Sequence, residues 1–291
     1  MLQGWYNVAQ IHWRYEPSVV QALLPKGFTV DTFDGAAWVG LIPFEMRRIR
    51  LPFGPNGGIG AGRFGTFPET NVRTYILDRQ GRRAVWFFSL DINRVAATLV
   101  ARTGYGLPYC TATMSVESAK GETVGALSSS SNRIADRVLV GSSKCRLAEN
   151  QQGNLEGTSP QNIASNDGES ALTMGDTVRY RSSRNWPKPA PGSTAKCDVE
   201  IRIGAPIEVE ADSLTAFLTA RWALGSSFFS RLLWAQIDHP TWPLHEAELL
   251  RCDETLLAPA GLPAPLSQPT ALWSPGVEVR IARPGLASRV G

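Results

Sequence analysis

The sequence predicts a mostly β fold of the α+β type, with a few short helices between the strands. Residues 67–77 alternate between polar and less polar side chains, which is the pattern of a strand with two different faces. Residues 84–90 form a continuous apolar and aromatic run of the length of a buried strand. Residues 178–182 and 197–203 alternate again. Strand patterns therefore recur along most of the chain.

A short helix is predicted directly after the apolar run. Asp91 and Asn93 offer capping side chains, and apolar residues then recur at helical spacing up to Arg102. The glycine and proline residues of 104–108 end this helix and lead into an extended segment over 109–116. The predicted unit is therefore a strand, a short helix and a second strand.

The middle of the chain differs in composition from the rest. No Phe, Trp or Tyr occurs from Cys110 to Arg179, and Ser, Asn, Gln, Gly and Glu dominate residues 141–175. Such a segment cannot bury enough apolar surface to offset the entropy that it loses on ordering. We therefore expect a single domain over residues 1–291 that carries a disordered or loosely packed insertion at about 141–175.

A second helix is predicted over residues 214–224. Its apolar residues recur at helical spacing, and either Asp212 or Ser213 can cap its first turn. No internal repeat is evident along the chain.

Composition excludes several classes of function. The net charge of +3 and the pI near 8.7 are too small an excess of basic residues to indicate nucleic-acid binding, and the densest basic cluster, residues 47–50, is more typical of a solvated strand end. The sequence has neither a charged and then apolar leader nor an apolar run of the roughly 18 residues that cross a bilayer. The four cysteines, Cys110, Cys145, Cys197 and Cys252, form no CxxC pair. We expect a cytoplasmic protein with reduced thiols that binds neither nucleic acid nor membranes.

The sequence also argues against a metal or an organic cofactor. Residues 60–65 match the GxGxxG dinucleotide pattern, but they lead into an extended segment and lack the helix N-terminus that would bind phosphate. The three histidines, His12, His239 and His245, lack the i, i+4 spacing of a helical metal site. Taken singly, each is more typical of a structural imidazole. We therefore expect no cofactor.

The polar face of residues 67–77 has two interpretations. Glu69, Asn71 and Arg73 lie on the same face of the predicted strand. If this face points into a barrel or a cleft, the interior is charged and functional. If it points to solvent, the same side chains form an ordinary surface ladder. Strand patterning alone leaves both interpretations open.

A set of motifs spreads over nearly the whole chain outside residues about 120 to 175. It comprises His12-Trp13, Leu24 to Phe28, Asp31 to Gly40, Ile42 to Phe44, Phe67 to Tyr75, Phe87 to Asp91, Ala101-Arg102, Gly106 to Tyr109, Phe217 to Trp222, His239 to Leu244 and Ala260 to Pro263. On these residues the chain resembles the YqjF-like family of uncharacterised bacterial proteins. The resemblance implies the fold of acetoacetate decarboxylase, a mostly antiparallel β structure closed into a cone-like barrel around a small-molecule cavity.

One departure from the decarboxylase pattern removes the best-known chemistry of that fold. In those enzymes a lysine after the Gly-aromatic-Pro turn forms a Schiff base with the keto acid, and a second lysine beside it lowers its pKa. Here the two positions hold Tyr109 and Cys110, neither of which can form an imine. The chain has only five lysines against 24 arginines, and no two of them are adjacent: Lys26, Lys120, Lys144, Lys188 and Lys196. Schiff-base decarboxylation is therefore not expected.

The resemblance and the residue types together select candidate site residues. If the protein is an enzyme, we expect Glu69 to act as an acid or base, Tyr109 to polarise a carbonyl or donate a proton, and Arg73 or Arg102 to hold an anion. The candidate substrate-binding residues are His12, Asn71, Arg102, Arg221, His239 and Trp242.

Some of these candidates carry a structural alternative. Arg102 and Arg221 either pair with Glu69 or Asp91, or clamp a substrate carboxylate with the guanidinium fork. Cys110 is a nucleophile only if a histidine approaches it, and a buried inert thiol is the more common role of a free cysteine.

Two main hypotheses follow for the function. The first is a barrel that binds a small carboxylated or carbonyl-containing molecule and acts as a lyase, hydratase or isomerase without a metal or organic cofactor. The second is a binding or sensing module that has the cavity and no catalysis, with Tyr109 and Trp242 as walls. A third is a structural or partner-binding protein with a filled interior. The ligand, the reaction and whether the chain forms a homo-oligomer are left open.

Overall fold

The computed structural model of the chain describes residues 1–51, 59–60, 65–94, 106–121 and 171–287. Its elements are β1 Leu2–Tyr15, α1 Pro17–Gln21, β2 Thr29–Val30, β3 Ala37–Leu51, β4 Ile59–Gly60, β5 Phe67–Leu77, β6 Arg83–Ile92, β7 Tyr109–Ala119, β8 Thr177–Trp186, β9 Lys196–Ile207, α3 Leu214–Thr219, β10 Ala223–Phe228, β11 Arg231–Asp238, β12 Leu244–Glu254, the 3₁₀ helix η3 Ala258–Ala260, β13 Thr270–Ile281 and β14 Gly285–Leu286. The predicted mostly β fold with a few short helices is confirmed.

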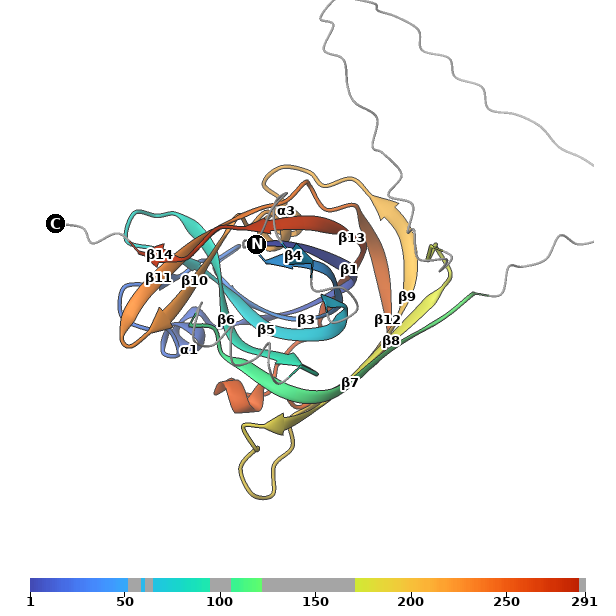
Figure 1. Cartoon of the computed structure of the whole chain (residues 1–291), viewed down its shortest axis with the longest axis horizontal. Coiled ribbons are helices and arrows are strands. Elements are labelled where there is room, and N and C mark those ends of the chain that lie inside the picture. The colour runs from blue at the N-terminus through green and yellow to red at the C-terminus, as the bar shows by residue number, and fades with distance from the viewer. Residues whose placement is uncertain (52–58, 61–64, 95–105, 122–170, 288–291) are drawn as a thin grey trace, which may run out of the picture. The chain divides into compact units, whose positions relative to one another are not determined.

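The strands form one sheet that closes on itself twice. The path of paired strands runs β14-β11-β10-β6-β7-β8-β9-β12-β13-β1-β3-β5-β2, and β6 also pairs with β5 while β11 also pairs with β13. A first ring therefore consists of β1, β3, β5, β6, β10, β11 and β13. A second ring shares β13, β1, β3, β5 and β6 and is completed by β7, β8, β9 and β12. Figure 1 shows the two additional groups of strands on opposite sides of the shared ones.

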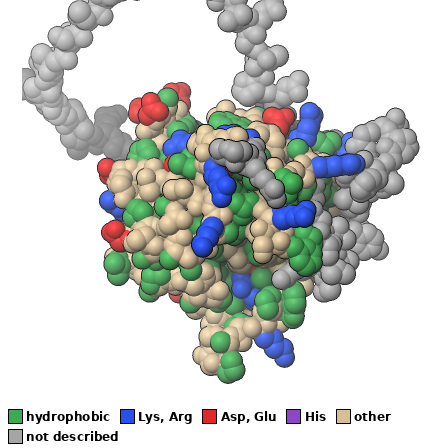
Figure 2. Space-filling view, turned by 90° about the vertical axis from the view of Figure 1, so that its left-hand side faces the viewer, with side chains coloured by type: hydrophobic (Ala, Val, Ile, Leu, Met, Phe, Trp, Pro, Cys, Tyr) green, Lys and Arg blue, Asp and Glu red, His purple; other side chains and the backbone are tan. Residues whose placement is uncertain are grey.

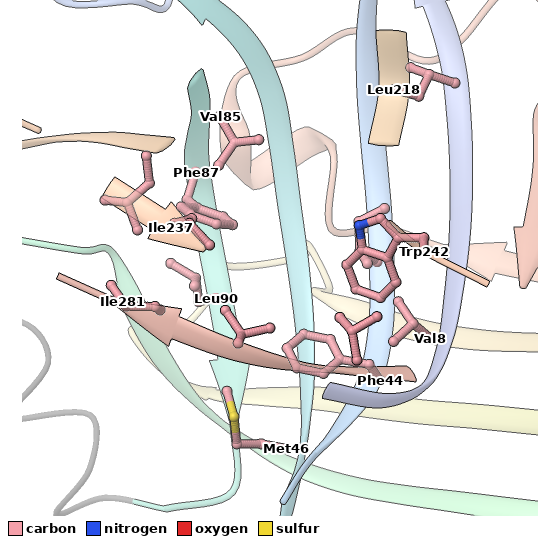
Figure 3. Packing of buried hydrophobic residues seen from close by; sticks show 14 of the residues in the cluster. Val8, Phe44, Met46, Val85, Phe87, Leu90, Leu218, Ile237, Trp242 and Ile281 are labelled. Atoms are coloured by element: carbon pink, nitrogen blue, oxygen red, sulfur yellow. The ribbon is translucent and has the colours of Figure 1, made fainter. Parts of the chain in front are cut away.

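Each ring encloses its own hydrophobic core. The first core includes Val8, Phe44, Tyr75, Leu90, Trp242 and the inward residues of β10, β11 and β13. Figure 3 shows side chains of this core converging from several strands, with Val8, Phe44 and Trp242 close together. The second core includes Ile11, Val39, Val72, Tyr180 and Trp273 together with the inward residues of β9. The shared strands therefore separate two apolar interiors and bury both of their faces.

Strand β5 has the bounds that the alternating pattern predicts, and both of its faces are buried. Phe67 and Tyr75 belong to the first core, whereas Val72 belongs to the second. Because side chains alternate along a strand, Glu69 and Arg73 face the first core together with Tyr75. Glu69 is only 2% exposed, so the interpretation of this face as a solvent-facing ladder is wrong.

A backbone irregularity in β1 changes which face points to the first core. Asn7 has a left-handed φ of 48°, and the pairing of β1 with β3 shifts register between Tyr6 and Ile11. As a result Trp5 and Val8, three residues apart, both pack in the first core. After this bulge the alternation resumes and carries His12 to the same side as Val8.

Helix α3 begins where the sequence predicts and ends five residues earlier. The Ser213 hydroxyl accepts a hydrogen bond of 3.1 Å from the Ala216 amide, as an N-cap does. The helix ends at Thr219, because Ala223 and Leu224 are drawn into β10, where Leu224 pairs in parallel with Val85 of β6. The predicted helix over 214–224 was therefore too long.

The other predicted helix and most of the predicted insertion lie outside the described residues. The helix would occupy positions 95–102, and only residues 171–175 of the insertion are described. Asp91, a predicted cap, is instead a buried residue of β6. Residues 1–121 and 172–291 belong to one compact unit.

Figure 2 shows the side of the molecule that lies at the left of Figure 1, where basic side chains are interspersed with hydrophobic and uncharged groups. Within the described ranges, no helix is long and apolar enough to cross a membrane.

Candidate functional site

The first core contains a cluster of polar side chains brought together by strand register. Asn71 of β5 is paired with Leu90 of β6, and Leu90 is paired with Tyr109 of β7. This row places Tyr109, which is half-buried against the first core, beside the polar face of β5. The side chains of both Asn71 and Tyr109 hydrogen-bond to the Glu69 carboxyl. Three of the predicted site residues therefore form one connected group.

Glu69 is a buried carboxyl without a cationic partner in this group. Burial raises its pKa from the ordinary 4.5 to about 8, and the nearby Asp91 charge acts in the same direction, while the hydrogen bonds from Asn71 and Tyr109 oppose the rise. Glu69 is therefore protonated at neutral pH. One of its oxygens, Oε2, has no hydrogen-bond partner in the described structure. The site thus holds a neutral carboxyl with an unused hydrogen-bonding atom.

Arg73 is a buried guanidinium that lacks a carboxylate partner. It is only 9% exposed, and within the described part of the chain it forms no ion pair. One weak hydrogen bond of 3.5 Å joins Nη2 to Oε1 of Gln10, and the guanidinium lies 5.8 Å from the centroid of the Tyr75 ring. Its Nε has no hydrogen-bond partner among the residues that the structure describes. A buried charge is costly unless it is paired, so this arrangement is suited to an external anion.

His12 is fully buried beside Arg73 and is neutral. Burial, followed by the Arg73 charge, lowers its pKa well below the usual 6.5. Its Nε2 lies 2.7 Å from the Tyr75 hydroxyl, which donates to the Leu218 carbonyl at 2.9 Å. Gly40 makes room for this ring, because a Cβ at position 40 would lie 2.8 Å from Nε2. His12 therefore connects β1, β5 and α3 next to the uncompensated cation.

Arg221 has a structural partner that differs from both predicted ones. Its Nη1 lies 2.5 Å from Oδ2 of Asp31, and its Nε donates to the Phe217 carbonyl at 2.9 Å. The guanidinium also stacks over the rings of Tyr75 and Phe217 at 4.7 and 4.3 Å. The alternative in which Arg221 pairs with Glu69 or Asp91 is therefore wrong. Arg102 lies outside the described residues.

His239 and Trp242 line the first core near Arg221. Nε2 of His239 lies 3.2 Å from the Arg221 carbonyl oxygen, and Nδ1 lies 2.8 Å from that of Pro240. Trp242 is buried between His239 and Trp5, with ring centroids 5.4 and 6.1 Å away. The motif at 239–244 therefore fixes the chain around Arg221 and supplies an aromatic wall, which Figure 3 shows at Trp242.

Asp91 and Cys110 face away from this cluster. Arg184 donates to Asp91 from Nη2 at 2.7 Å and from Nε at 3.1 Å, and the same guanidinium reaches the Ser89 hydroxyl at 2.8 Å. Burial raises the pKa of Asp91, although the bonds from Arg184 lower it. Cys110 is buried and hydrogen-bonds to Asp91. Among the described residues the hydrogen bonds of this thiol go to Asp91 and to the Pro108 carbonyl, which fits the buried, inert role better than the nucleophile alternative.

Polar atoms without a partner gather in the first core. Six of the nine buried side-chain atoms that lack a hydrogen bond in the described structure belong to its polar residues: Gln10 Nε2, His12 Nδ1, Glu69 Oε2, Asn71 Oδ1, Arg73 Nε and Arg221 Nη2. Buried polar groups are normally satisfied, so this concentration makes the first core the candidate site. Gln10, Tyr75 and Asp31 were not among the predicted site residues. The alternation of β1 places Gln10 on the face of His12 and would have indicated it.

The donor set does not resemble a metal site. Among the residues that the structure describes, no group of three or more His, Cys, Asp or Glu side chains is arranged to hold a metal ion. The cluster combines two guanidiniums, a neutral carboxyl, a neutral imidazole and two amides. This combination suits a small organic anion better than a cation.

The sequence matches a known protein family and a curated relative along most of its length. The sequence profile of the family DUF2071, described as an uncharacterized conserved protein, matches residues 2–168 and 159–278. The chain is 28% identical over 269 residues to the uncharacterized protein YqjF of Bacillus subtilis strain 168, which covers 92% of this chain and 85% of that protein.

Two solved structures are similar in fold over the full length of the chain. The enduracididine biosynthesis enzyme MppR complexed with pyruvate gives a TM-score of 0.55 at 12% identity, with 100% of this chain and 91% of that chain covered. An acetoacetate decarboxylase-like enzyme from Sphingomonas wittichii RW1 gives 0.54 at 13% identity, with 100% and 94% covered. The predicted resemblance is confirmed: the chain belongs to the DUF2071 family of uncharacterized proteins and has the acetoacetate decarboxylase-like fold.

Proposed function

We propose that the polar cluster of the first core binds a small molecule bearing a carboxylate, with Arg73 as the anion-binding group. The observation that carries this proposal is the buried guanidinium of Arg73, which has no carboxylate partner among the described residues. Removing one partner of a buried ion pair typically costs about 3–5 kcal/mol, because the remaining charge is left uncompensated. A bound carboxylate would recover part of that free energy and would accept two hydrogen bonds from the guanidinium fork.

The carbonyl end of such a ligand would lie toward Glu69. Arg73 and Glu69 are four residues apart on one strand face, about 13 Å between their Cα atoms at the usual rise, with Asn71 between them. Both side chains are long, so a short carboxylic acid can reach from one to the other. MppR, which shares the fold, has been solved with pyruvate, an oxo acid. A small carboxylic acid that carries a second oxygen-containing polar group is therefore the ligand class that we propose.

The chemistry that these residues can perform is proton transfer. Glu69 is protonated at neutral pH and can donate to an oxygen on which negative charge develops. Tyr109 hydrogen-bonds to this carboxyl and holds it toward Asn71. With no lysine at position 109 or 110, the imine route is closed. We therefore propose a lyase, hydratase or isomerase that works by acid and base groups and by the Arg73 charge.

A non-catalytic binding or sensing module is the second candidate function. It is favoured by the presence of Tyr109 at the position where the decarboxylases have their nucleophilic amine. In this case the same residues bind the acid and no product forms. Turnover distinguishes the two candidates, since both predict binding through Arg73.

The test is native mass spectrometry of the full chain purified without denaturation, followed by turnover assays with oxo and hydroxy acids. We expect the wild-type protein to retain or bind a small acid and Arg73→Gln to lose it. Glu69→Gln should keep the acid and lose turnover, because glutamine preserves the shape and cannot give up a proton. Arg14→Gln, an exposed residue of β1, is the charge-matched control. Equal retention by Arg73→Gln and the wild type would refute the proposal.

A further inference from the structure

The hydrogen bonds between Glu69 and Asn71 leave one unused atom on each side chain. The Glu69 carboxyl receives bonds from the Asn71 amide and from Tyr109, and its Oε2 has no partner among the described residues. The Asn71 amide donates to Glu69, and its carbonyl oxygen, Oδ1, likewise has no partner in the part of the chain that the structure describes. The two side chains are 2% and 5% exposed, so bulk water does not satisfy these atoms. An unsatisfied donor and an unsatisfied acceptor therefore lie on adjacent side chains of the same strand face.

The two atoms have complementary roles. A neutral carboxyl that accepts bonds on one oxygen presents a hydroxyl donor on the other, and an amide oxygen is an acceptor. Leaving either one buried without a partner is costly, whereas a ligand group that supplies both partners removes both penalties. A ketone only accepts hydrogen bonds. A second carboxylate also only accepts them, and it adds a buried negative charge that has no cationic partner at this pair.

We infer that the ligand carries, besides the carboxylate held at Arg73, an uncharged group that both accepts and donates a hydrogen bond, a hydroxyl or a carboxamide, held between Glu69 and Asn71. The inference rests on the proposed function, because the carboxylate at Arg73 sets the position of the chain that reaches this pair. It makes Asn71 the residue that selects hydroxy or carbamoyl acids over plain oxo acids and over dicarboxylates.

The experiment compares matched acids by isothermal titration calorimetry at pH 6.5, where Glu69 is protonated. Each pair shares its skeleton: 4-hydroxypentanoate with levulinate, and succinamate with monomethyl succinate, while succinate tests a second charge. One unsatisfied buried group costs about 1–3 kcal/mol, which corresponds to roughly a 5-fold to 150-fold difference in Kd. We expect the hydroxy or carbamoyl member of at least one pair to bind more tightly by such a factor, and succinate to bind most weakly.

Variants assign the preference to the two atoms. Leucine has a similar shape to asparagine and lacks the oxygen. In Asn71→Leu the ratio of the two Kd values within a pair should therefore be close to one. Glu69→Gln should keep the ratio of Kd values within a pair, because its amide still donates a hydrogen bond. This variant should also bind the acids above pH 8, where the wild type loses affinity as Glu69 ionises. Circular dichroism and thermal unfolding confirm that each variant is folded.

The outcomes separate the two proposals. Equal affinity for the two acids within both pairs, or a preference that persists in Asn71→Leu, overturns the inference. In that case the proposed function still stands if Arg73→Gln binds every acid more weakly than the wild type does. If Arg73→Gln leaves the affinities for all acids unchanged, the proposed function fails, whatever the ratio of Kd values within each pair. Absence of binding by every acid in the wild type contradicts both.

Discussion

At the scale of single residues, the site depends on groups whose ordinary charge states are changed by burial. Burial raises the pKa of Glu69 and lowers the pKa of His12, so both side chains are neutral at neutral pH. Because Arg221 is paired with Asp31, Arg73 is the guanidinium of this cluster that has no carboxylate partner among the described residues. If the proposed function holds, we expect this arrangement to favour an anion with one charge over an anion with two.

The protonation of Glu69 predicts a pH dependence of stability. The folded protein keeps this proton up to about pH 8, whereas the unfolded chain releases it near 4.5, so folding takes up a proton between these values and stability falls as pH rises through that window. The slope from one such group reaches about 1.4 kcal/mol per pH unit. Urea unfolding of wild type and Glu69→Gln from pH 4.5 to 8 should show a stability difference that grows in favour of the variant. A difference that does not change with pH would show that Glu69 is ionised in the folded state.

Gly40 predicts how closely the site is packed. A Cβ at this position would lie 2.8 Å from His12 Nε2 and 2.9 Å from Cδ2, so Gly40→Ala must displace the ring from the Tyr75 hydroxyl. We expect a loss of about 1–3 kcal/mol of stability, as for other overpacked interiors, and weaker binding of acids at Arg73. Gly285→Ala is the matched control, because a Cβ there meets nothing within 4 Å. Equal unfolding midpoints for the two variants would contradict this account of Gly40.

At the scale of elements, the strands around the site were predictable and the helices were predictable only in part. The bounds of β5 follow from its alternation, because both of its faces bury side chains of different character. The end of α3 was not predictable from the local pattern. Leu224 belongs to a strand because it pairs with Val85 of β6, which is distant in sequence. The choice between a polar interior and a polar surface for β5 likewise depends on ring closure, which no local pattern contains.

The cap of α3 predicts an effect on the site from a distance. Ser213 satisfies the amide of Ala216, and the helix that it starts supplies the carbonyls that hold the Tyr75 hydroxyl and Arg221 Nε. Ser213→Ala should cost about 1 kcal/mol in urea unfolding, and Ser213→Asp should restore it. Hydrogen exchange at the amides of α3 should accelerate in the alanine variant alone. Unchanged exchange there would show that the cap does not support the helix.

At the scale of the whole molecule, the two rings have different roles. The first core contains six of the nine unsatisfied buried polar atoms of the described structure, whereas in the second core Asp91 of β6 is paired with Arg184 of β8 and only Ser182 Oγ and Trp273 Nε1 lack a partner among the described residues. Partners such as Asp91 with Arg184, and Asp31 with Arg221, are 93 and 190 residues apart in sequence. These pairings could not be deduced from the sequence, because the residue types fit several partners equally well.

The Asp91 and Arg184 pair predicts a large stability effect without a direct effect on binding. Both side chains are buried, at 0% and 7% exposure, so Arg184→Met leaves an uncompensated carboxylate and should cost about 3–5 kcal/mol. The double variant Asp91→Leu, Arg184→Met should recover much of that loss, because no buried charge remains. Urea unfolding of the wild type, both single variants and the double variant measures the coupling. Additive losses would show that the pair is not coupled in the folded protein.

The central claim is that Arg73 is an anion-binding residue inside the first ring. Calorimetric titration of levulinate into wild type, Arg73→Gln and the surface control Arg14→Gln at one ionic strength tests it most directly. Loss of a hydrogen bond to a charged group predicts a Kd about 10-fold to 150-fold weaker for Arg73→Gln, with Arg14→Gln close to the wild type. Equal affinity of Arg73→Gln and the wild type, or an equal loss in the two variants, would contradict the claim.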